Sequence, residues 1–253
     1  MTSYIDFLHK ISDEADSIST YYFVRQKELA ITHKENGSPV SLADLEIEKK
    51  IHLHTSKTFQ NWGIWGEELG PFNIAKDIVL IVDPIDATRN FIRQIPLFAT
   101  LLAIQVEGKI VAGMVSSPIH RERWWAQKNQ GAFFNNNPIH VSKVKTLAKS
   151  QLFYGSLFGC EAATVPQTIH HLLSKTDRQR GLGDYYSHAL VAMGSGECSV
   201  DFGLQPWDMA PFKIIVEEAG GKVTHLNGSF DLRQDSLICS NGLFHKEILE
   251  ILS

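Results

Sequence analysis

Hydrophobic residues near the N-terminus recur with the period of an amphipathic helix. They are spaced three or four positions apart, and residues at this spacing share one face of an α-helix. The series comprises Tyr4, Leu8, Ile11, Ala15, Ile18 and Tyr22. Ser3 and Asp6 form a capping pair at its start, and the similar pair Ser41 and Asp44 predicts a second helix that runs to about Lys57.

Short apolar runs between and after these helices predict β-strands. Asp77–Val82 is apolar throughout its middle, as in a strand that is buried on both faces. Phe98–Val106 and Ile110–Ser117 flank Glu-Gly-Lys, which is a hairpin signature. Further strands are predicted at Glu28–Thr32, Trp62–Glu67, Glu122–Gln127 and Phe133–Phe134.

Beyond Ser142 the pattern changes to alternating helices and strands. Helices are predicted at Ala162–Ser174, Tyr186–Gly194, Asp208–Ala219 and Gly242–Leu249, and strands at Gln151–Tyr154, Ser199–Phe202, Lys222–Thr224 and Leu237–Ser240. We therefore expect an N-terminal α+β half with a large antiparallel sheet over residues 1–145, and a C-terminal α/β half over residues 146–253. A chain of 253 residues, 43% of them hydrophobic, can bury the core of one large domain or of two intimately packed halves.

Composition and charge exclude several classes of protein. The formal net charge is −4, and no basic cluster is denser than Arg121-Glu-Arg123, which argues against a nucleic-acid-binding protein. No apolar run approaches the ~20 residues of a membrane span, and the charged N-terminal segment lacks a secretory signal. The cysteines are few and widely spaced, which predicts reduced thiols in a cytoplasmic protein. They are Cys160, Cys198 and Cys239.

Acidic residues at the ends of predicted elements are the candidates for chemistry. Asp83 and Asp86 follow a buried strand, and open α/β sheets place their sites in the loops at such strand ends. The alternative is a capped turn with Asp86 at the start of a short helix. Glu67 and Glu68 also end a strand, where the alternative is an ordinary polar strand end. Asp208 begins a predicted helix and can serve as its N-cap, as a ligand, or as both.

Bound cations would be needed if four of these acids converged, namely Glu67, Asp83, Asp86 and Asp208. Two carboxylates ~4 Å apart repel by roughly 4 kcal/mol at an effective dielectric constant of about 20. Divalent cations remove this cost, and ligands that are all oxygen select Mg²⁺ first and Mn²⁺ second. A pair of such ions bridged by acids serves in-line attack on phosphorus, so these acids indicate phosphoryl chemistry.

Several segments together resemble the signatures of the inositol monophosphatase superfamily of Mg²⁺-dependent phosphatases. They are Glu67-Glu68, Asp83–Thr88, Trp207-Asp208, Glu218–Gly221 and the stretch from Lys34 to Asp44. Their order and separation match from about residue 5 to the end of the chain. The resemblance implies a layered αβαβα sandwich of the α/β class, a small-molecule phosphate ester as substrate, and a homodimer.

The same resemblance implies roles for individual residues. It implies two or three Mg²⁺ ions, with Mn²⁺ as an alternative, held by Glu67, Asp83, the Ile85 carbonyl, Asp86 and Asp208. Asp44 and Thr88 resemble the pair that orients the attacking water, with Glu67 as a further catalytic residue. Lys34 lies in the loop that closes over the site, and its alternative role is that of a solvated loop lysine. The implied substrate-binding residues are Asp86, Ala87, Thr88, Arg89, Arg180, Asp184 and Asp201.

Ala87 departs from the pattern of the superfamily, which usually has glycine at this position. If residue 87 has a positive φ, alanine costs about 1–2 kcal/mol there. If φ is negative, the methyl group crowds the bound phosphate instead. The departure concerns the phosphate geometry rather than the metal ligands.

Within the superfamily, three segments resemble the histidinol-phosphate phosphatase branch. They are Phe91–Leu102, Arg123–Trp125 and Arg180–Asp184. An acid at residue 184 suits a substrate that carries an ammonium group, and Asp201 resembles a substrate contact; the alternative role of Asp184 is a helix N-cap.

The resemblance therefore implies Mg²⁺-dependent hydrolysis of L-histidinol phosphate to L-histidinol and phosphate, in histidine biosynthesis, by a metal-activated water. One alternative is an inositol-1-phosphate phosphatase or a broad-specificity relative. The other is a pseudoenzyme that binds phosphometabolites without turnover.

Overall fold

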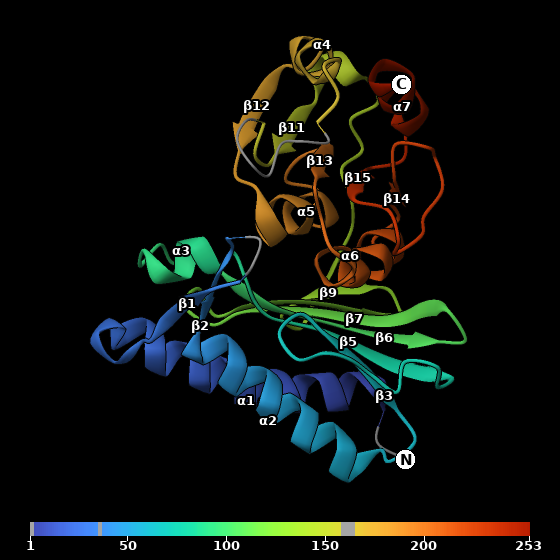
Figure 1. Cartoon of the computed structure of the whole chain (residues 1–253). Helices are drawn as coiled ribbons and strands as arrows, with labels where there is room; N and C mark the ends of the chain where they lie inside the picture. Colours follow the sequence, from blue (N-terminus) through green and yellow to red (C-terminus); the bar gives the residue numbers. More distant parts are fainter. Residues whose placement is uncertain (1–2, 35–36, 158–164) are drawn as a thin grey trace.

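The computed structural model describes residues 3–34, 37–157 and 165–253. Its helices and sheets stack in five layers, which Figure 1 shows. The first layer contains helices α1 (Tyr4–Val24) and α2 (Leu42–Thr58), and the middle helical layer contains α5 (Asp184–Ala192) and α6 (Pro206–Glu218). Helices α4 (Ile169–Ser174) and α7 (His245–Leu252) form the last layer. Because a sheet lies between successive helical layers, the predicted αβαβα sandwich is confirmed.

An eight-stranded sheet lies between α1 and α2 on one face and α5 and α6 on the other (Figure 1). Its strand order is β10-β9-β8-β7-β6-β5-β3-β4, and neighbours are antiparallel except for β3 and β5, which run parallel. The strands are β3 (Gly63–Gly66), β4 (Gly70–Phe72), β5 (Ile78–Asp86), β6 (Ala99–Val106), β7 (Lys109–Ser117), β8 (Glu122–Gln127), β9 (Ala132–Phe134) and β10 (Asn137–Ile139).

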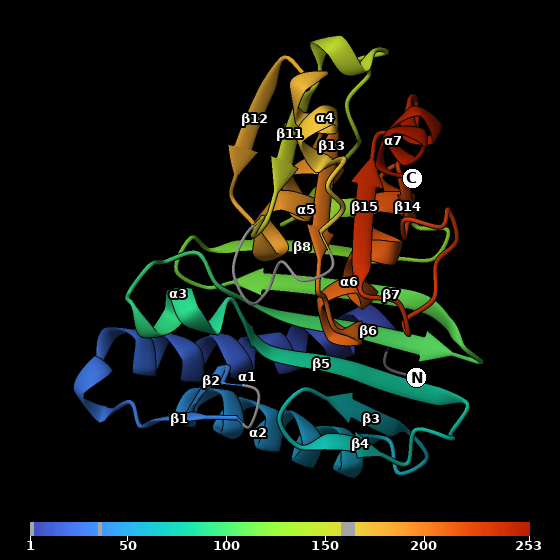
Figure 2. The same ribbon diagram turned by 45° about the horizontal axis from the view of Figure 1, so that its top comes forward.

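A five-stranded sheet lies beyond α5 and α6, and Figure 2 shows its strands crossing those of the first sheet. Its order is β12-β11-β13-β15-β14, in which β11 is parallel to both neighbours and the other pairs are antiparallel. The strands are β11 (Gln151–Tyr154), β12 (Arg178–Gly181), β13 (Cys198–Phe202), β14 (Lys222–Thr224) and β15 (Ser236–Ser240). The remaining described elements are α3 (Thr88–Ile92), a ribbon of β1 (Ile31–His33) and β2 (Pro39–Ser41), and 3₁₀ turns at Gln26–Glu28 and Leu147–Lys149.

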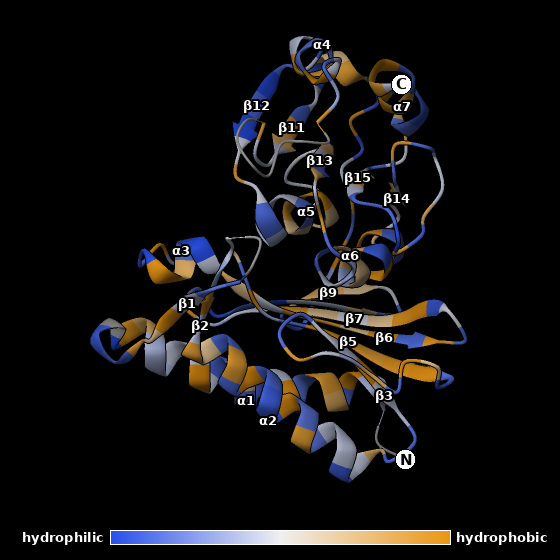
Figure 3. Cartoon of the chain, viewed as in Figure 1, coloured by the Kyte–Doolittle hydropathy of each residue, from blue (hydrophilic) through white to orange (hydrophobic). Residues whose placement is uncertain are grey.

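The apolar face of α1 packs against the eight-stranded sheet, as its helical period predicts. Phe7 and Leu8 share one buried cluster with Leu102 of β6. In Figure 3 hydrophobic positions are concentrated on the strands of this sheet and alternate with polar positions along the two helices below it. The predicted cap is present, because the Asp6 N–H donates to Ser3 Oγ over 3.1 Å.

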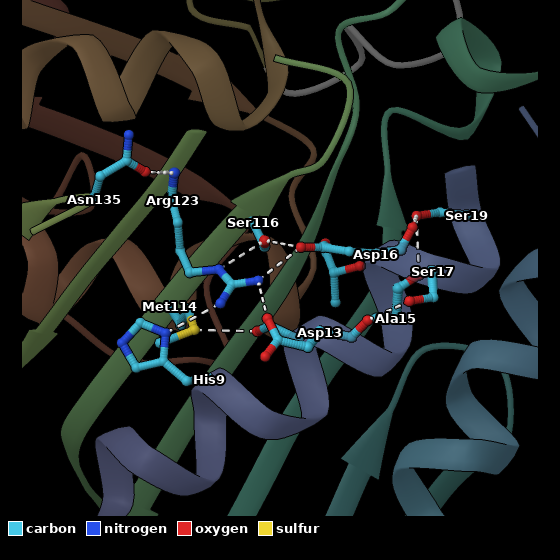
Figure 4. A network of polar contacts seen from close by, with 12 residues as sticks. His9, Asp13, Ala15, Asp16, Ser17, Ser19, Met114, Ser116, Arg123 and Asn135 are labelled. Carbon is cyan, nitrogen blue, oxygen red and sulfur yellow. Dashed lines mark hydrogen bonds and ion pairs between the residues drawn. The ribbon is translucent and has the colours of Figure 1, made fainter. Parts of the chain in front are cut away.

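A polar network also joins α1 to the sheet (Figure 4). Arg123 on β8 donates from Nη2 to Asp16 Oδ2 over 2.7 Å and to Asp13 Oδ1 over 2.9 Å. Its Nε donates to Ser116 Oγ on β7 over 3.0 Å, and that hydroxyl donates to Asp16 Oδ2 over 2.8 Å. Burial raises the pKa of Asp16, whereas the charge of Arg123 lowers it. The network fixes α1 relative to two strands through one carboxylate.

Strand β5 is longer than the sequence predicts. The apolar run ends at Val82, but the strand continues to Asp86, with an irregular register against β6 between Asp83 and Asp86. The two acids therefore lie on the end of the strand itself rather than in a separate loop.

The C-terminal half differs from the prediction at four elements. The helix predicted from Tyr186 begins at Asp184, and the helix predicted from Gly242 begins at His245. Strand β12 was not predicted because its Arg-Gln-Arg-Gly sequence has no apolar alternation. Of the helix predicted at Ala162–Ser174, residues 162–164 lie outside the described residues, and α4 forms only its last part.

Two further expectations concern thiols and membranes. Cys198 and Cys239 are free cysteines, as predicted, and the structure buries both; Cys160 lies outside the described residues. Among the described helices, none combines the length and the apolar character that a membrane span requires.

Candidate functional site

Three carboxylates from two distant segments converge in the described structure. Asp83 and Asp86 lie on the irregular end of β5, and Asp208 lies in the first turn of α6. One ligand oxygen from each residue lies within 4.8 Å of the other two. Asp208 is held in place because its Oδ2 accepts a 2.7 Å hydrogen bond from the Gln205 N–H. The N-cap of α6 is Gln205, so the alternative role of Asp208 as the N-cap is wrong; Asp208 is the third residue of the helix, where it forms a capping box with Gln205 and also joins the acidic cluster.

Burial and mutual repulsion make the ionised state of the three acids unfavourable. Burial raises the pKa of Asp83, and the charges of Glu67 and Asp86 raise it further. Burial likewise raises the pKa of Asp86, followed by the charges of Asp184 and Asp208, and burial raises the pKa of Asp208 to about 8. Asp83 Oδ1 is buried and has no hydrogen-bond partner among the described residues. An all-oxygen cluster with an unpaired buried oxygen fits a hard divalent cation such as Mg²⁺.

Glu67 lies at the edge of this cluster and is paired with a lysine. It follows β3, where its N–H donates to the Val82 carbonyl of β5 over 3.1 Å. Lys34 Nζ donates to Glu67 Oε1 over 2.8 Å and lies 2.8 Å from Glu68 Oε1. Burial lowers the pKa of Lys34, but the hydrogen bonds and charges of the two glutamates outweigh burial and raise it overall. Lys34 is therefore an ion-paired residue of the site rather than a solvated loop lysine.

Glu48 is a candidate residue that the sequence reasoning missed. It lies on α2 and is 1% exposed, and its carboxylate accepts 2.8 Å hydrogen bonds from the N–H groups of Glu68 and Leu69. These bonds hold the turn that carries Glu67. A side chain at residue 66 would collide with the same carboxylate, which explains Gly66. The available signal was the position of Glu48 in the predicted helix, where it shares the buried face with Ala43, Ile47 and Ile51.

Asp44 and Thr88 lie beside the acidic cluster. Thr88 Oγ1 donates to the Ile85 carbonyl over 2.9 Å and lies 3.4 Å from Asp44 Oδ1, near the outer limit of a hydrogen bond. Asp44 Oδ2 accepts a 2.8 Å hydrogen bond from the Ser41 N–H, as part of the capping box of α2. Asp44 is fully buried, and burial raises its pKa to about 7. The structure therefore brings the predicted pair together, although the Thr88 hydroxyl lies closer to the Ile85 carbonyl than to Asp44.

Ala87 has the left-handed backbone conformation, with φ 63° and ψ 45°, directly before helix α3. Of the two alternatives for this residue, the structure selects the positive φ. The β-carbon of an L-residue is crowded in this region, at a cost of about 1–2 kcal/mol, which glycine avoids.

A cavity of about 520 Å³ opens beside the acidic cluster. Six of the implied substrate-binding residues line it, namely Asp86, Ala87, Thr88, Arg89, Asp184 and Asp201. Arg180 is not among the lining residues, and its Nη1 donates to the Gln179 carbonyl over 2.7 Å on the exposed strand β12. Lining residues that the sequence did not reveal include Asn90, Arg93, Tyr154 and His188. Apart from Arg93, which lies in the segment Phe91–Leu102, no motif marks these residues, because they meet only when α3, β11 and α5 are assembled.

The part of the cavity wall that the C-terminal half forms is acidic, because it contains Asp184 and Asp201. Asp184 begins α5 with a φ of 49°, and its Oδ2 accepts a 3.4 Å hydrogen bond from Asn90 Nδ2. The N-cap of α5 is Gly183, so the alternative role of Asp184 as the N-cap is wrong. Asp201 on β13 is 7% exposed, and its Oδ1 accepts a 3.0 Å hydrogen bond from the Phe202 N–H.

Comparisons with known proteins point to one family. Residues 3–253 match the inositol monophosphatase family. The histidinol-phosphatase of Streptomyces coelicolor is 35% identical over 265 residues, covering 100% of this chain and 99% of the relative. The histidinol-phosphatase of Mycobacterium tuberculosis is 33% identical over 248 residues, covering 96% of this chain and 95% of the relative. The solved structure of the extragenic suppressor protein suhB from Bartonella henselae has a TM-score of 0.91 at 29% identity and covers 98% of both chains.

Proposed function

Because this chain belongs to the inositol monophosphatase family and is a phosphoric monoester hydrolase, we propose that it hydrolyses L-histidinol phosphate in histidine biosynthesis, with Mg²⁺ as its cofactor. The observation that carries the choice of substrate is the pair of acids, Asp184 and Asp201, in the cavity that also adjoins the acidic cluster. An ester with an ammonium group offers these acids a charge-assisted hydrogen bond, whereas an inositol phosphate offers only hydroxyls beyond its phosphate. The names of the two similar relatives support the same choice.

The cation ligands that we propose are Glu67, Asp83, the Ile85 carbonyl, Asp86 and Asp208, for two or three Mg²⁺ ions with Mn²⁺ as the alternative. The convergence of three of these acids and the unpaired Asp83 Oδ1 support this set. When bound, Mg²⁺ neutralises phosphate oxygens and makes water a better nucleophile. The raised pKa values of the acids reflect the same need for positive charge.

Asp44 and Thr88 are the residues that we assign to the attacking water. Thr88 lines the cavity, and its hydroxyl lies 3.4 Å from Asp44 Oδ1, so it can orient a water and pass its proton toward that carboxylate. A pKa of about 7 allows Asp44 to accept this proton near neutral pH. The water attacks phosphorus in line as the bond to the leaving alkoxide breaks, and no covalent phosphoenzyme is needed.

The substrate spans the cavity in this proposal. The phosphate lies against Ala87–Arg89, where the guanidinium of Arg89 adds positive charge, and the ammonium group lies against Asp184 and Asp201. Arg180 lies outside the cavity and does not contact the substrate in this arrangement. The site thus draws on both halves of the chain, 1–145 and 146–253, and the resemblance to the family further suggests a homodimer that acts in the cytoplasm.

Phosphate release by metal-stripped protein tests this function. L-histidinol phosphate should release no phosphate after metal removal, and added Mg²⁺ should restore the rate. Asp83→Asn should stay inactive with Mg²⁺. The control is Asp77→Asn, which replaces an exposed aspartate directly before β5 and should retain activity. Undiminished release after metal removal, or normal Mg²⁺-dependent activity of Asp83→Asn, would contradict the proposed metal role.

The description of the matched family favours a second candidate, an inositol-1-phosphate phosphatase. The two candidates share the metal ligands and differ in the partner of Asp184 and Asp201. A higher kcat/KM for inositol-1-phosphate than for L-histidinol phosphate would select this second function.

A further inference from the structure

His188 is a buried histidine that lines the cavity and has no part in the reaction described above. It is 2% exposed and lies on α5, four positions after Asp184. Residues four positions apart share one face of an α-helix, so both side chains are on the same side of α5. Asp201 on β13 lines the same cavity. The acidic part of the wall therefore also contains one imidazole.

Two neighbours fix the orientation of this ring. Its Nδ1 lies 2.8 Å from Ser199 Oγ on β13, and its centroid lies 5.0 Å from that of the Phe212 ring on α6. Ser199 is the cross-strand neighbour of Cys239 on β15. Among the described residues, none forms a hydrogen bond with His188 Nε2. Because Nδ1 is engaged, Nε2 is the atom through which the ring can bind a molecule in the cavity.

The imidazole contributes a hydrogen-bonding group rather than a charge. Burial lowers the pKa of His188 to about 3, so the ring is neutral at neutral pH. The negative charge of this wall comes from Asp184 and Asp201. The wall therefore offers carboxylates for an ammonium group and, separately, one neutral ring nitrogen for a second polar group of the ligand.

We propose that His188 is a specificity-determining residue for this substrate. Its Nε2 forms a hydrogen bond with a ring nitrogen of the leaving group, which is a third group beside the phosphate and the ammonium. This inference rests on the proposed function and names the chemical class that the site selects, amino-alcohol phosphates with a further ring nitrogen. A ligand without such a group leaves a buried imidazole nitrogen unpaired, and sites of this kind reject such ligands. Loss of the bond should reduce kcat/KM by about ten- to a hundredfold.

Two amide substitutions distinguish the roles of the two ring nitrogens of His188. His188→Asn places an amide near the position of Nδ1, where it can still meet Ser199, and removes the group at Nε2. His188→Gln places its amide near the position of Nε2. With L-histidinol phosphate, His188→Asn should raise KM about ten- to a hundredfold with little change in kcat, and His188→Gln should recover part of this loss. With phenyl phosphate, which lacks the nitrogen-containing group, both variants should match the wild type.

A measurement on the wild-type protein covers the case in which the variants do not fold. The ¹⁵N chemical shift of His188 Nε2 should change when the product L-histidinol is added and should not change with inorganic phosphate alone. Equal losses of kcat/KM on both esters, no loss at all, or an unaltered Nε2 shift at saturating L-histidinol would overturn the role of His188. Wild-type rates report separately on the proposed function. If the wild type does not prefer L-histidinol phosphate over inositol-1-phosphate, that function fails, and the role of His188 fails with it.

Discussion

The backbone N–H of Tyr185 donates a 2.8 Å hydrogen bond to Asp86 Oδ2, across 99 positions of sequence. The same tyrosine is anchored at its other end, because its hydroxyl lies 3.0 Å from Ser117 Oγ on β7. Tyr185 follows Asp184 directly, so this double anchor sets the acidic wall of the cavity relative to the acidic cluster. The two parts of the site are therefore joined by one residue.

Tyr185→Phe tests this anchor. The substitution leaves the fully buried Ser117 hydroxyl without its partner, so we expect a loss of about 1–3 kcal/mol in the free energy of unfolding. Urea denaturation measures this change. Tyr186→Phe is the matched control on the same helix and should change stability by less than about 0.5 kcal/mol. Equal effects of the two substitutions would show that the Tyr185 hydroxyl contributes no specific anchor.

Ala87→Gly should stabilise the protein, because residue 87 has a φ of 63°. Relief of about 1–2 kcal/mol of backbone strain exceeds the 0.4–1 kcal/mol or so by which glycine stabilises the unfolded chain, leaving a net gain of roughly 0.5–1 kcal/mol. Thermal or urea unfolding measures it. Ala75→Gly is the control, an exposed alanine in a turn without positive φ, where glycine should destabilise. Destabilisation by both substitutions would mean that Ala87 is not strained.

Without metal, the acidic cluster should make stability decrease as pH rises. The pKa of Asp208 is about 8 in the folded protein, whereas an unfolded aspartate titrates near 3.9. The stability contributed by this protonated acid is present below pH ~4 and is lost progressively as pH rises toward about 8. Asp208→Asn removes one of the three acids with a raised pKa and should weaken this dependence, by more than the control Asp77→Asn does, in urea titrations with a chelator. Parallel pH profiles for wild type and Asp208→Asn would contradict the raised pKa.

His245 should give the opposite dependence at lower pH. Its Nε2 lies 2.8 Å from Thr224 Oγ1, and the Thr224 hydroxyl donates to the His225 carbonyl, so Nε2–H is the donor of the first pair. Its Nδ1 then accepts from Ser240 Oγ over 2.8 Å, which requires the neutral ring. Burial lowers the pKa of His245 to about 4, so its stabilising contribution is present above pH ~6.5 and is lost as pH falls toward 4.

His245→Gln should therefore weaken the acid sensitivity of the protein. As pH falls from 6.5 to about 4, its free energy of unfolding should rise relative to that of the wild type by about 1.4 kcal/mol per pH unit. His52→Gln, on helix α2, is the matched control, and the effect of His245→Gln should exceed that of this control. A profile of His245→Gln that runs parallel to that of the wild type would show that His245 is protonated in the folded state.

The parts of the site that lie in local motifs could be predicted from the sequence. Asp83, Asp86 and Asp208 stand at the ends of elements with clear hydrophobic patterns, so their convergence follows once the elements are placed. The family and the layered fold could be predicted for the same reason, because Glu67 and Asp44 occur with these three acids in a fixed order along the chain. The comparisons confirm both predictions.

The parts that depend on tertiary packing could not be predicted. Glu48 and His188 are polar residues on buried helix faces, and only the assembled structure shows what they face. The sequence left the sign of φ at Ala87 open, because the backbone there is set by the turn between β5 and α3. Strand β12 is an exposed polar edge, where pairing with β11 rather than apolar alternation defines the strand.

The specificity ratio of the purified wild-type protein tests the central claim most directly. It compares kcat/KM for phosphate release from L-histidinol phosphate and from inositol-1-phosphate, with the same protein and saturating Mg²⁺. A charge-assisted hydrogen bond from the ammonium group to Asp184 or Asp201, worth roughly 1.5–3 kcal/mol, predicts a ratio of at least about ten in favour of L-histidinol phosphate. A ratio near one, or one that favours inositol-1-phosphate, would contradict the account.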